Sequence, residues 1–159
     1  MPSVCYNNVI RQYGGDGMYD ISVALGGKKA LGKSAYNAGD YNALIQSGIS
    51  VEAGNHFKDL LQLTDKEFSK VLGISERSFH RRKGAKATLP VNASDRLYRF
   101  ARIFSYAVEV TGSEDNARKW LLAPHFSFEG KSPLEMLKTD AGAKDVEVVL
   151  AAIRYGASL

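Results

Sequence analysis

Side chains that can bind phosphates and the edges of bases are concentrated between residues 77 and 86. Arginine pairs with guanine or phosphate through two parallel hydrogen bonds, lysine attracts phosphate as a point charge, and serine and histidine add single donors. The candidate residues are Arg77, Ser78, His80, Arg81, Arg82, Lys83 and Lys86. This combination predicts contact with a nucleic-acid duplex, and the alternative is a basic helix face that is only solvated.

One apolar residue divides these candidates into two groups. Phe79 is the only large apolar residue before the basic run, so a helix would bury it. At about 100° per residue, the side chains that then point outward, toward bases, are those of Arg77, His80 and Arg81. The other cations, Arg82, Lys83 and Lys86, are assigned to phosphates. For His80 the alternative is a solvated side chain with no role in recognition.

Positive charge is confined to the same part of the chain. From Arg77 to Arg102 there are eight basic residues and a single acidic residue, Asp95, which gives a local net charge of +7. The whole chain carries only +4, so the remaining residues sum to −3. A local excess of this kind is typical of a phosphate-binding surface rather than of a uniformly basic protein.

The flanking residues predict a helix-turn-helix. Thr64 followed by Glu67 forms the capping box of a first helix, and Gly73 can take the left-handed conformation that ends it. Ser75 is suited to cap a second helix, which carries Phe79 toward the core. The second helix of this motif lies in the major groove of DNA. A plain α-hairpin is the alternative interpretation of the same spacing.

No spacing typical of a catalytic or metal site accompanies these residues. The possible metal ligands Cys5, His56, His80 and His125 are far apart in the sequence. The candidate catalytic residues His56, His125, Glu129 and Asp140 lie in separate predicted helices and loops, without a nucleophile-base spacing. Gly26-Gly27 followed by two lysines is too short and lacks the flanking pattern of a P-loop. We therefore expect no enzymatic activity, no metal and no cofactor.

Composition predicts a folded cytoplasmic protein. With 159 residues, of which 45% are hydrophobic and 24% charged, the chain can bury one good core or two small ones. No apolar run approaches the roughly 20 residues needed to span a bilayer. The first residues lack the basic start and apolar stretch of a signal peptide. A single cysteine, Cys5, cannot form an internal disulfide.

Apolar residues recur at helical spacing through most of the chain, which predicts an all-α fold. Residues up to Gly15 are expected to form an arm, and residues 19–25 a short helix or strand. Outside the two-helix motif, helices are predicted at about 41–46, 51–63, 113–123, 133–137 and 144–155. A longer helix, capped by Asn92 or Ser94, follows a loop from Lys83 to Val91 and buries an apolar stripe up to Val108.

The predicted elements divide the chain into three parts. Residues 1–47 form an N-terminal arm with short helices, and residues 48–91 form a helix-turn-helix DNA-binding domain. Residues 92–159 form a small helical C-terminal domain. DNA readers of this type usually bind paired half-sites as symmetric dimers, so we expect a homodimer.

The chain resembles a known family from about Tyr41 to Gly156. The matching residues are Leu72-Gly73-Ile74-Ser75, Arg81-Arg82, Ser94-Asp95-Arg96-Leu97, Trp120-Leu121, Pro124, Gly130, Pro133 and Ile153-Arg154-Tyr155-Gly156. In this order and spacing they resemble the Xre/MbcA/ParS-like antitoxins that pair with RES-domain toxins. The chain departs from the usual pattern at Phe79, at Phe128 and in the loop at residues 88–90.

The resemblance implies a function for both domains. Residues 92–159 would be a toxin-binding domain, and the protein would sterically neutralise an NAD-degrading RES toxin and repress its own operon by binding operator DNA. A toxin–antitoxin hetero-oligomer is therefore expected. The residues that we expect to contact the toxin are Trp120, Phe126, Arg154, Tyr155 and Leu159. The alternative function is a helix-turn-helix transcriptional repressor without a toxin partner.

The end of the chain is the candidate for blocking the toxin. Arg154 offers a planar cation for a carboxylate in a dinucleotide cleft, Tyr155 offers rigid contact area, and Leu159 ends in a carboxylate. The alternative role of Arg154 is to interact with the negative end of its own helix dipole, which by itself would explain a cation there.

Overall fold

The computed structural model describes residues 19–156, so the predicted arm up to Gly15 and the C-terminal Leu159 lie outside the described residues. The elements are α2 (Ile21–Ala24), α3 (Gly27–Leu31), α4 (Ala38–Ser47), α5 (Val51–Leu61), α6 (Asp65–Leu72), α7 (Glu76–Ala85), α8 (Val91–Thr111), α9 (Glu114–Leu122), the 3-10 helix η1 (Phe126–Phe128), α10 (Pro133–Met136) and α11 (Asp140–Tyr155). The predicted all-α fold is confirmed, and residues 19–25 contain a helix rather than a strand.

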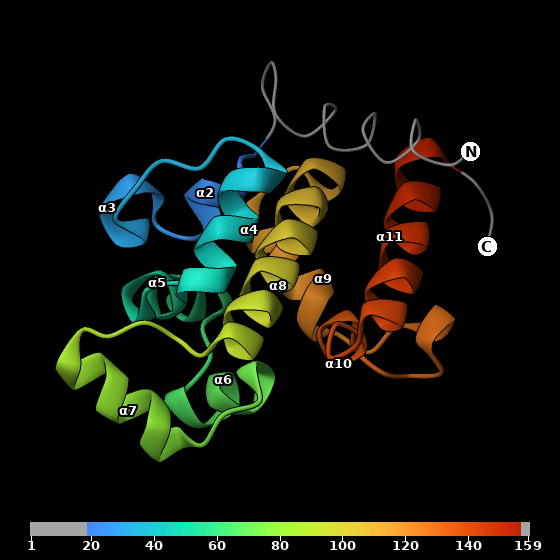
Figure 1. Ribbon diagram of the computed structural model, residues 1–159. Coiled ribbons are helices and arrows are strands. Elements are labelled where there is room, and N and C mark those ends of the chain that lie inside the picture. The colour runs from blue at the N-terminus through green and yellow to red at the C-terminus, as the bar shows by residue number, and fades with distance from the viewer. Residues whose placement is uncertain (1–18, 157–159) are drawn as a thin grey trace.

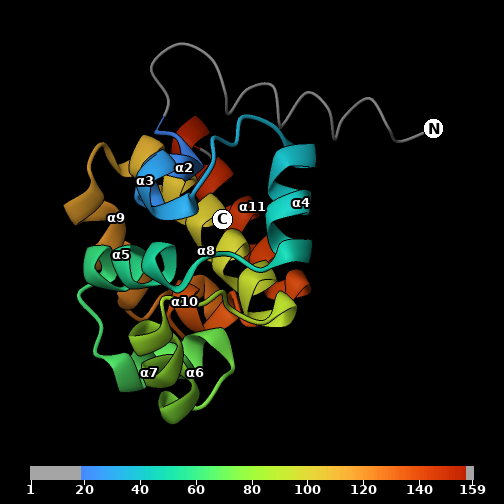
Figure 2. The same ribbon diagram turned by 60° about the vertical axis from the view of Figure 1, so that its left-hand side comes forward.

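Helix α8 is the centre of the fold (Figure 1; Figure 2). It packs against α2, α4 and α6 from the first part of the chain and against α9 and α11 from the last part. The apolar stripe predicted for it is buried, with Leu97, Phe100 and Phe104 all inaccessible to solvent. Because both parts pack on the same helix, they share one continuous hydrophobic core. The three-part division of the chain stays a prediction.

The start of α8 differs from the prediction. The helix begins at Val91 with Pro90 at the N-cap, so neither Asn92 nor Ser94 caps it. Pro90 suits this place because its fixed φ and missing amide hydrogen cost nothing where an amide would be free. Ser94 instead lies buried inside the helix, where its hydroxyl accepts a hydrogen bond from the amide of Ile49 at 2.8 Å and so ties the start of α8 to the α4–α5 connection.

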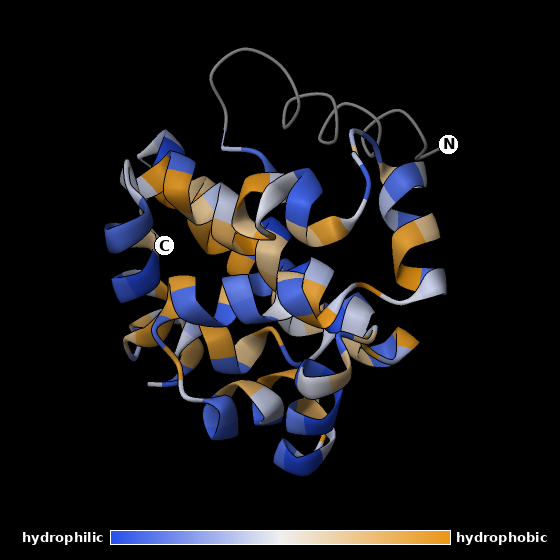
Figure 3. Ribbon diagram, turned by 90° about the vertical axis from the view of Figure 1, so that its left-hand side faces the viewer, coloured by the Kyte–Doolittle hydropathy of each residue, from blue (hydrophilic) through white to orange (hydrophobic). Residues whose placement is uncertain are grey.

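A row of buried phenylalanines joins α5, α6, α7 and α8. The ring of Phe57 contacts Phe104 at a centroid distance of 5.7 Å and Phe68 at 6.4 Å, and Phe68 contacts Phe79 at 5.6 Å. Phe79 therefore faces the core, as predicted. Figure 3 shows that hydrophobic and hydrophilic residues alternate around the helices, so each helix has an apolar side to bury.

The last helix starts earlier than predicted and ends as predicted. It begins at Asp140 rather than near Lys144, because the side chain of Thr139 accepts a hydrogen bond from the amide of Gly142 and caps it there. It ends at Gly156, whose φ of 65° is in the left-handed region. The short helix before it has a capping box formed by Ser132 and Glu135, and proline in its first turn.

Candidate functional site

Helices α6 and α7 form the predicted two-helix motif. Thr64 and Glu67 make both hydrogen bonds of the capping box, and Gly73 ends α6 with a φ of 74°. The hydroxyl of Ser75 accepts a hydrogen bond from the amide of Ser78 at 3.1 Å and caps α7. Helix α7 continues to Ala85, so its last three residues are helical rather than part of the predicted loop, and the loop before α8 is short.

The outer side of α7 presents cations that are not bound elsewhere in the fold. Arg77, Arg81 and Lys86 are exposed and form no ion pair with the residues that the structure describes. Ser78 is half-buried, and His80 is exposed. Free guanidinium groups on the outer face of a helix are available to phosphates or bases without first breaking an internal contact.

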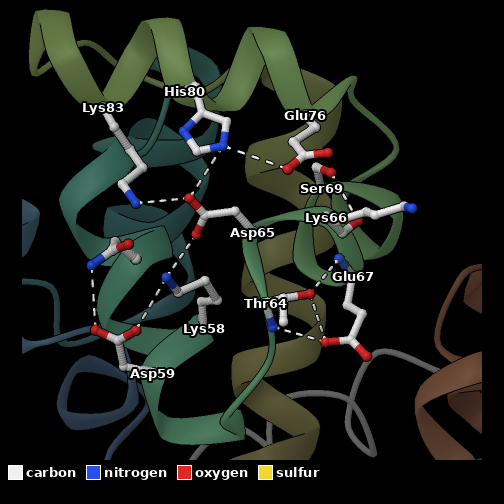
Figure 4. A network of polar contacts seen from close by, with 11 residues as sticks. Lys58, Asp59, Thr64, Asp65, Lys66, Glu67, Ser69, Glu76, His80 and Lys83 are labelled. Carbon is white, nitrogen blue, oxygen red and sulfur yellow. Dashed lines mark hydrogen bonds and ion pairs between the residues drawn. The ribbon is translucent and has the colours of Figure 1, made fainter.

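Asp65, at the start of α6, joins three helices through its carboxylate (Figure 4). Its oxygens lie 2.7 Å from Nζ of Lys58 on α5 and 3.0 Å from Nζ of Lys83 on α7. Nε2 of His80, also on α7, lies 3.5 Å away and is 3.6 Å from the carboxylate of Glu76. The Asp65 side chain is only 16% exposed, so this contact sets how α7 lies against α5 and α6.

Two of the cations assigned to phosphates are held by the fold. Nη1 of Arg82 donates a hydrogen bond of 2.6 Å to the carbonyl of Thr88 in the loop before α8. Lys83 pairs with Asp65, and its ammonium lies 5.5 Å from the centroid of the Phe79 ring. Both side chains therefore contribute to the position of α7, and their contact with phosphate stays a prediction.

The charge network makes stability depend on pH. Burial alone would raise the pKa of Asp65, but hydrogen bonds from Lys58 and Lys83 outweigh it and hold the pKa below the usual aspartate value. A group whose pKa is lower in the folded state stabilises the fold above its unfolded pKa, about 3.9, and loses that contribution as pH falls through the folded value.

Asp65→Asn is therefore expected to lower the free energy of unfolding at pH 7 by about 2 kcal/mol, because it weakens two hydrogen bonds to charged groups. The melting temperature should fall by about 4 to 8 °C, and the difference from the natural chain should shrink as pH falls below about 4. Calorimetry over pH 2 to 7 measures this. Asp59→Asn is the matched control, because Asp59 also contacts Lys58 but is 64% exposed. Equal losses in both variants would contradict a special role for Asp65.

A contact between Gly73 and Arg96 was missed by the sequence analysis. A Cβ atom added at Gly73 would lie 2.5 Å from Nη1 of Arg96, so the guanidinium of α8 lies directly against the end of α6. A cation is favourable there because the carbonyl groups at the end of a helix carry partial negative charge. The sequence marks Gly73 as a helix end, but nothing near it indicates a partner more than twenty residues away.

Two of the C-terminal candidates, Trp120 and Phe126, lie at or beside the turn between α9 and α10. Trp120 is half-buried and its ring lies 5.8 Å from that of His125, which in turn lies 5.3 Å from Phe128. Phe126 is 97% exposed. Trp120 near the end of α9 is therefore packed against the turn, whereas Phe126 within the turn faces solvent.

Arg154 and Tyr155 lie at the other end of α11. Nη1 of Arg154 is 3.3 Å from a carboxylate oxygen of Glu109 on α8, whose side chain is only 11% exposed. Burial raises the pKa of Glu109, and the charge of Arg154 opposes that rise. Arg154 also lies over the ring of Tyr155, which is 72% exposed. Arg154 thus has a partner inside the fold, whereas Tyr155 faces solvent.

Residues 19–156 contain no group of three or more histidine, cysteine, aspartate or glutamate side chains arranged to hold a metal ion. None of the helices in this part of the chain is long and apolar enough to cross a membrane.

Two family models match successive parts of the chain. Residues 40–102 match the antitoxin Xre-like helix-turn-helix domain, and residues 107–156 match the antitoxin Xre/MbcA/ParS C-terminal toxin-binding domain. The fold and these matches define a protein of the antitoxin class, in which a helix-turn-helix domain precedes a toxin-binding domain. The chain belongs to the Xre/MbcA/ParS-like antitoxin family, as its sequence pattern indicated.

Individual relatives agree with this assignment. Antitoxin Xre of Photorhabdus laumondii is 28% identical over 116 residues, which cover 72% of this chain and 78% of that protein. Antitoxin Xre of Pseudomonas putida is 41% identical over 71 residues, or 45% of each protein. A chain in the crystal structure of the M. tuberculosis MbcT-MbcA toxin-antitoxin complex has the same fold, with a TM-score of 0.51 and 21% identity over 74% of this chain and 99% of that chain.

Proposed function

We propose that this antitoxin binds a RES-domain, NAD-degrading toxin and neutralises it sterically, and that it represses its own operon by binding operator DNA. The observation that carries the proposal is the solvent exposure of large apolar side chains within the toxin-binding domain. These side chains are Leu122, Phe126, Val148, Ile153 and Tyr155. Apolar surface left exposed in this way favours a protein partner that covers it. The RES class of the partner rests on the resemblance to the family.

Steric neutralisation is proposed to use the end of α11 and the residues after it. A toxin that binds a dinucleotide needs an open cleft, and the proposal is that the segment ending in Leu159 occupies it. Tyr155 supplies an exposed aromatic ring near the end of α11. Arg154 is 41% exposed and already neutralised by Glu109, so we assign it first to holding the end of α11 and second to the toxin.

Growth assays test the tail with variants chosen from this geometry. Arg154→Glu is unsuitable because it would place a second carboxylate against the nearly buried Glu109. Deletion of Ala157–Leu159 is expected to leave the melting temperature within about 3 °C, which is less than about 2 kcal/mol of stability, but to let the toxin arrest growth in co-expression, since the cleft would be left open. Full protection by the deletion variant, produced at normal levels, would contradict a role for the tail.

For DNA, we propose that α7 enters the major groove, with Arg77, Ser78, His80 and Arg81 facing base edges. Lys86 is available for phosphate, and Arg82 and Lys83 add positive charge while they support α7. A homodimer would present two such helices to paired half-sites, and the toxin would join it in a hetero-oligomer. Both activities are proposed to take place in the cytoplasm and to need neither catalysis nor a cofactor.

The alternative function is that of a transcriptional repressor without a toxin partner. One pair of binding experiments distinguishes it from the proposed function. The purified chain is mixed with the protein encoded by the adjoining reading frame and, separately, with the DNA upstream of its own gene. Binding to both supports an autoregulating antitoxin. Binding to DNA alone favours the plain repressor, because a toxin-binding domain would then serve only in assembly.

A further inference from the structure

A cleft opens between the turn after α9 and the outer side of α11. Its volume is about 570 Å³, and its apolar lining comes from Phe128, Met136, Val148 and Val149. Clefts of about 300 to 1,000 Å³ are large enough to bury small ligands or several side chains. Val148 is 60% exposed, so apolar surface in the cleft is left open to solvent.

The turn that forms one wall is held in a single shape. The amide of His125 donates to the carbonyl of Lys131 at 3.0 Å, and the amide of Gly130 donates to the carbonyl of His125 at 3.1 Å. The His125 ring is also packed between Trp120 and Phe128. A wall that is already ordered loses little conformational entropy when a partner binds. Phe126 is therefore an exposed aromatic side chain carried by an ordered backbone on the rim of the cleft.

The rim of the cleft is acidic. Glu129 and Asp145 contribute carboxylates and Lys131 contributes one ammonium, which gives a net charge of −1. None of the three forms an ion pair with a residue in the described part of the chain. Glu129 also has a φ of 55°, a left-handed conformation that is uncommon outside glycine, asparagine and aspartate. An apolar floor with free carboxylates at its edge suits an apolar side chain that is followed or preceded by a basic residue.

The position of the cleft indicates which partner supplies that side chain. All the residues that line it lie within residues 107–156, the toxin-binding domain. Val148 and the exposed Tyr155 are seven residues apart on α11, so they lie on the same side of the helix and extend the apolar surface from the cleft to the helix end. The cleft is thus continuous with the surface proposed above for the toxin.

We propose that this cleft, with Phe126 on its rim, is the anchor site for an apolar side chain of the toxin that lies beside a toxin lysine or arginine. The inference rests on the proposed function, since it specifies which surface of the antitoxin binds the toxin and which kinds of side chain make the contact. Aromatic side chains at the centre of an interface commonly carry most of its binding energy. Phe126 would then be the residue whose loss weakens binding most.

The test uses the full chain and the purified protein encoded by the adjoining reading frame, with binding measured by titration calorimetry. Phe126→Ala is expected to weaken binding at least about 30-fold, because it removes a central aromatic contact. Val148→Arg should do the same by filling the cleft and placing a cation against the toxin's cation. Asp145→Lys is expected to weaken binding about 5- to 10-fold, with a smaller effect at high salt.

Two matched controls come from outside both family domains. Tyr36→Ala removes an aromatic side chain that is 81% exposed, and Val23→Arg introduces the same cation at a valine that is 49% exposed. Both are expected to bind the toxin like the natural chain. All variants should keep the natural melting temperature within about 3 °C and the natural affinity for upstream DNA.

The outcomes separate the inference from the function on which it rests. If the natural chain does not bind the adjoining protein, the proposed function fails. If the natural chain binds and Phe126→Ala and Val148→Arg bind equally well, the function stands and the anchor site is wrong. If these two variants change only the oligomeric state of the free antitoxin and not its binding to the toxin, the cleft is an interface between copies of this chain. That result also overturns the inference.

Discussion

Replacing Arg77 and Arg81 together by glutamate is expected to lower affinity for upstream DNA by about 30-fold or more. Both side chains are exposed on the outer side of α7 and have no ionic partner among the described residues. Each arginine contact to a base is worth about 1 to 3 kcal/mol, so the loss of two costs about 2 to 6 kcal/mol before repulsion is added. The fold should be unaffected, because neither residue supports α7.

Fluorescence anisotropy at several salt concentrations measures this effect. For the natural chain, a surface that neutralises about 4 to 6 phosphates gives a slope of about −4 to −5 in log affinity against log salt for each DNA-binding unit, and the variant should have a smaller slope. Lys29→Glu with Lys33→Glu is the matched control, since it makes the same change in charge at exposed lysines outside the two-helix motif. An equal loss in the control would show that net charge, not α7, determines binding.

Gly142→Ala is expected to have the largest effect on stability of any conservative change discussed. A Cβ atom at this position would lie 2.0 Å from the backbone carbonyl oxygen of Met136, so α10 and α11 could no longer approach each other. Backbone cannot move aside as a flexible side chain can. We expect a loss of about 3 kcal/mol, the upper end of the usual cost of overpacking, and a melting temperature lower by about 6 to 12 °C.

Gly84→Ala, also a replacement of glycine by alanine, is expected to raise stability rather than lower it. Nothing lies within 4 Å of a Cβ atom at Gly84, which is inside α7 and has no positive φ. Alanine there should stabilise the protein by about 0.5 to 1 kcal/mol, since it restricts the unfolded chain and favours helix. Thermal unfolding of the two variants side by side measures both effects. A Gly142→Ala protein as stable as the natural chain would show that α10 and α11 are not in close contact.

Local signals explain how much of the fold was predictable. The capping boxes at Thr64 and Ser132 and the helix end at Gly73 depend on residues three or four positions apart, and all three are present in the structure. Phe79 was placed in the core because helical spacing alone sets its direction. The family was recognisable for a related reason, since its motifs keep their order and spacing along the chain.

The features that sequence reasoning missed depend on contacts between distant residues. Arg81 and Arg82 are neighbours of the same type, yet Arg81 faces solvent while Arg82 binds the carbonyl of Thr88. Asp65 directly follows the cap residue Thr64, which places it in a first helical turn, but spacing does not indicate that it joins α5 to α7. The start of α8 was misplaced because Ser94 resembles a cap locally, but the fold buries it against Ile49. The spacing of residues along the chain does not predict any of these contacts, because the two partners come from different elements.

For the candidate toxin-binding residues as well, the sequence identifies the residue types but not their contacts or exposure. Phe126 and Tyr155 are both exposed aromatics, and this exposure could not be distinguished in sequence from the packed state of Trp120. The pairing of Arg154 with Glu109 was also hidden, because the two residues are 45 positions apart. Because Arg154 is paired within the fold and Phe126 is not packed, the structure makes Phe126 and the cleft beside it better candidates for toxin binding than Arg154.

The central claim, that the chain holds a toxin through its C-terminal domain, is tested most directly by copurification. The natural chain, carrying an affinity tag, is co-expressed with the protein encoded by the adjoining reading frame and purified. Native mass spectrometry then measures the mass of the purified assembly. We predict a stable complex that contains both proteins, and its loss with Phe126→Ala but not with Tyr36→Ala. Recovery of the chain alone, at full yield and normal stability, would contradict the claim.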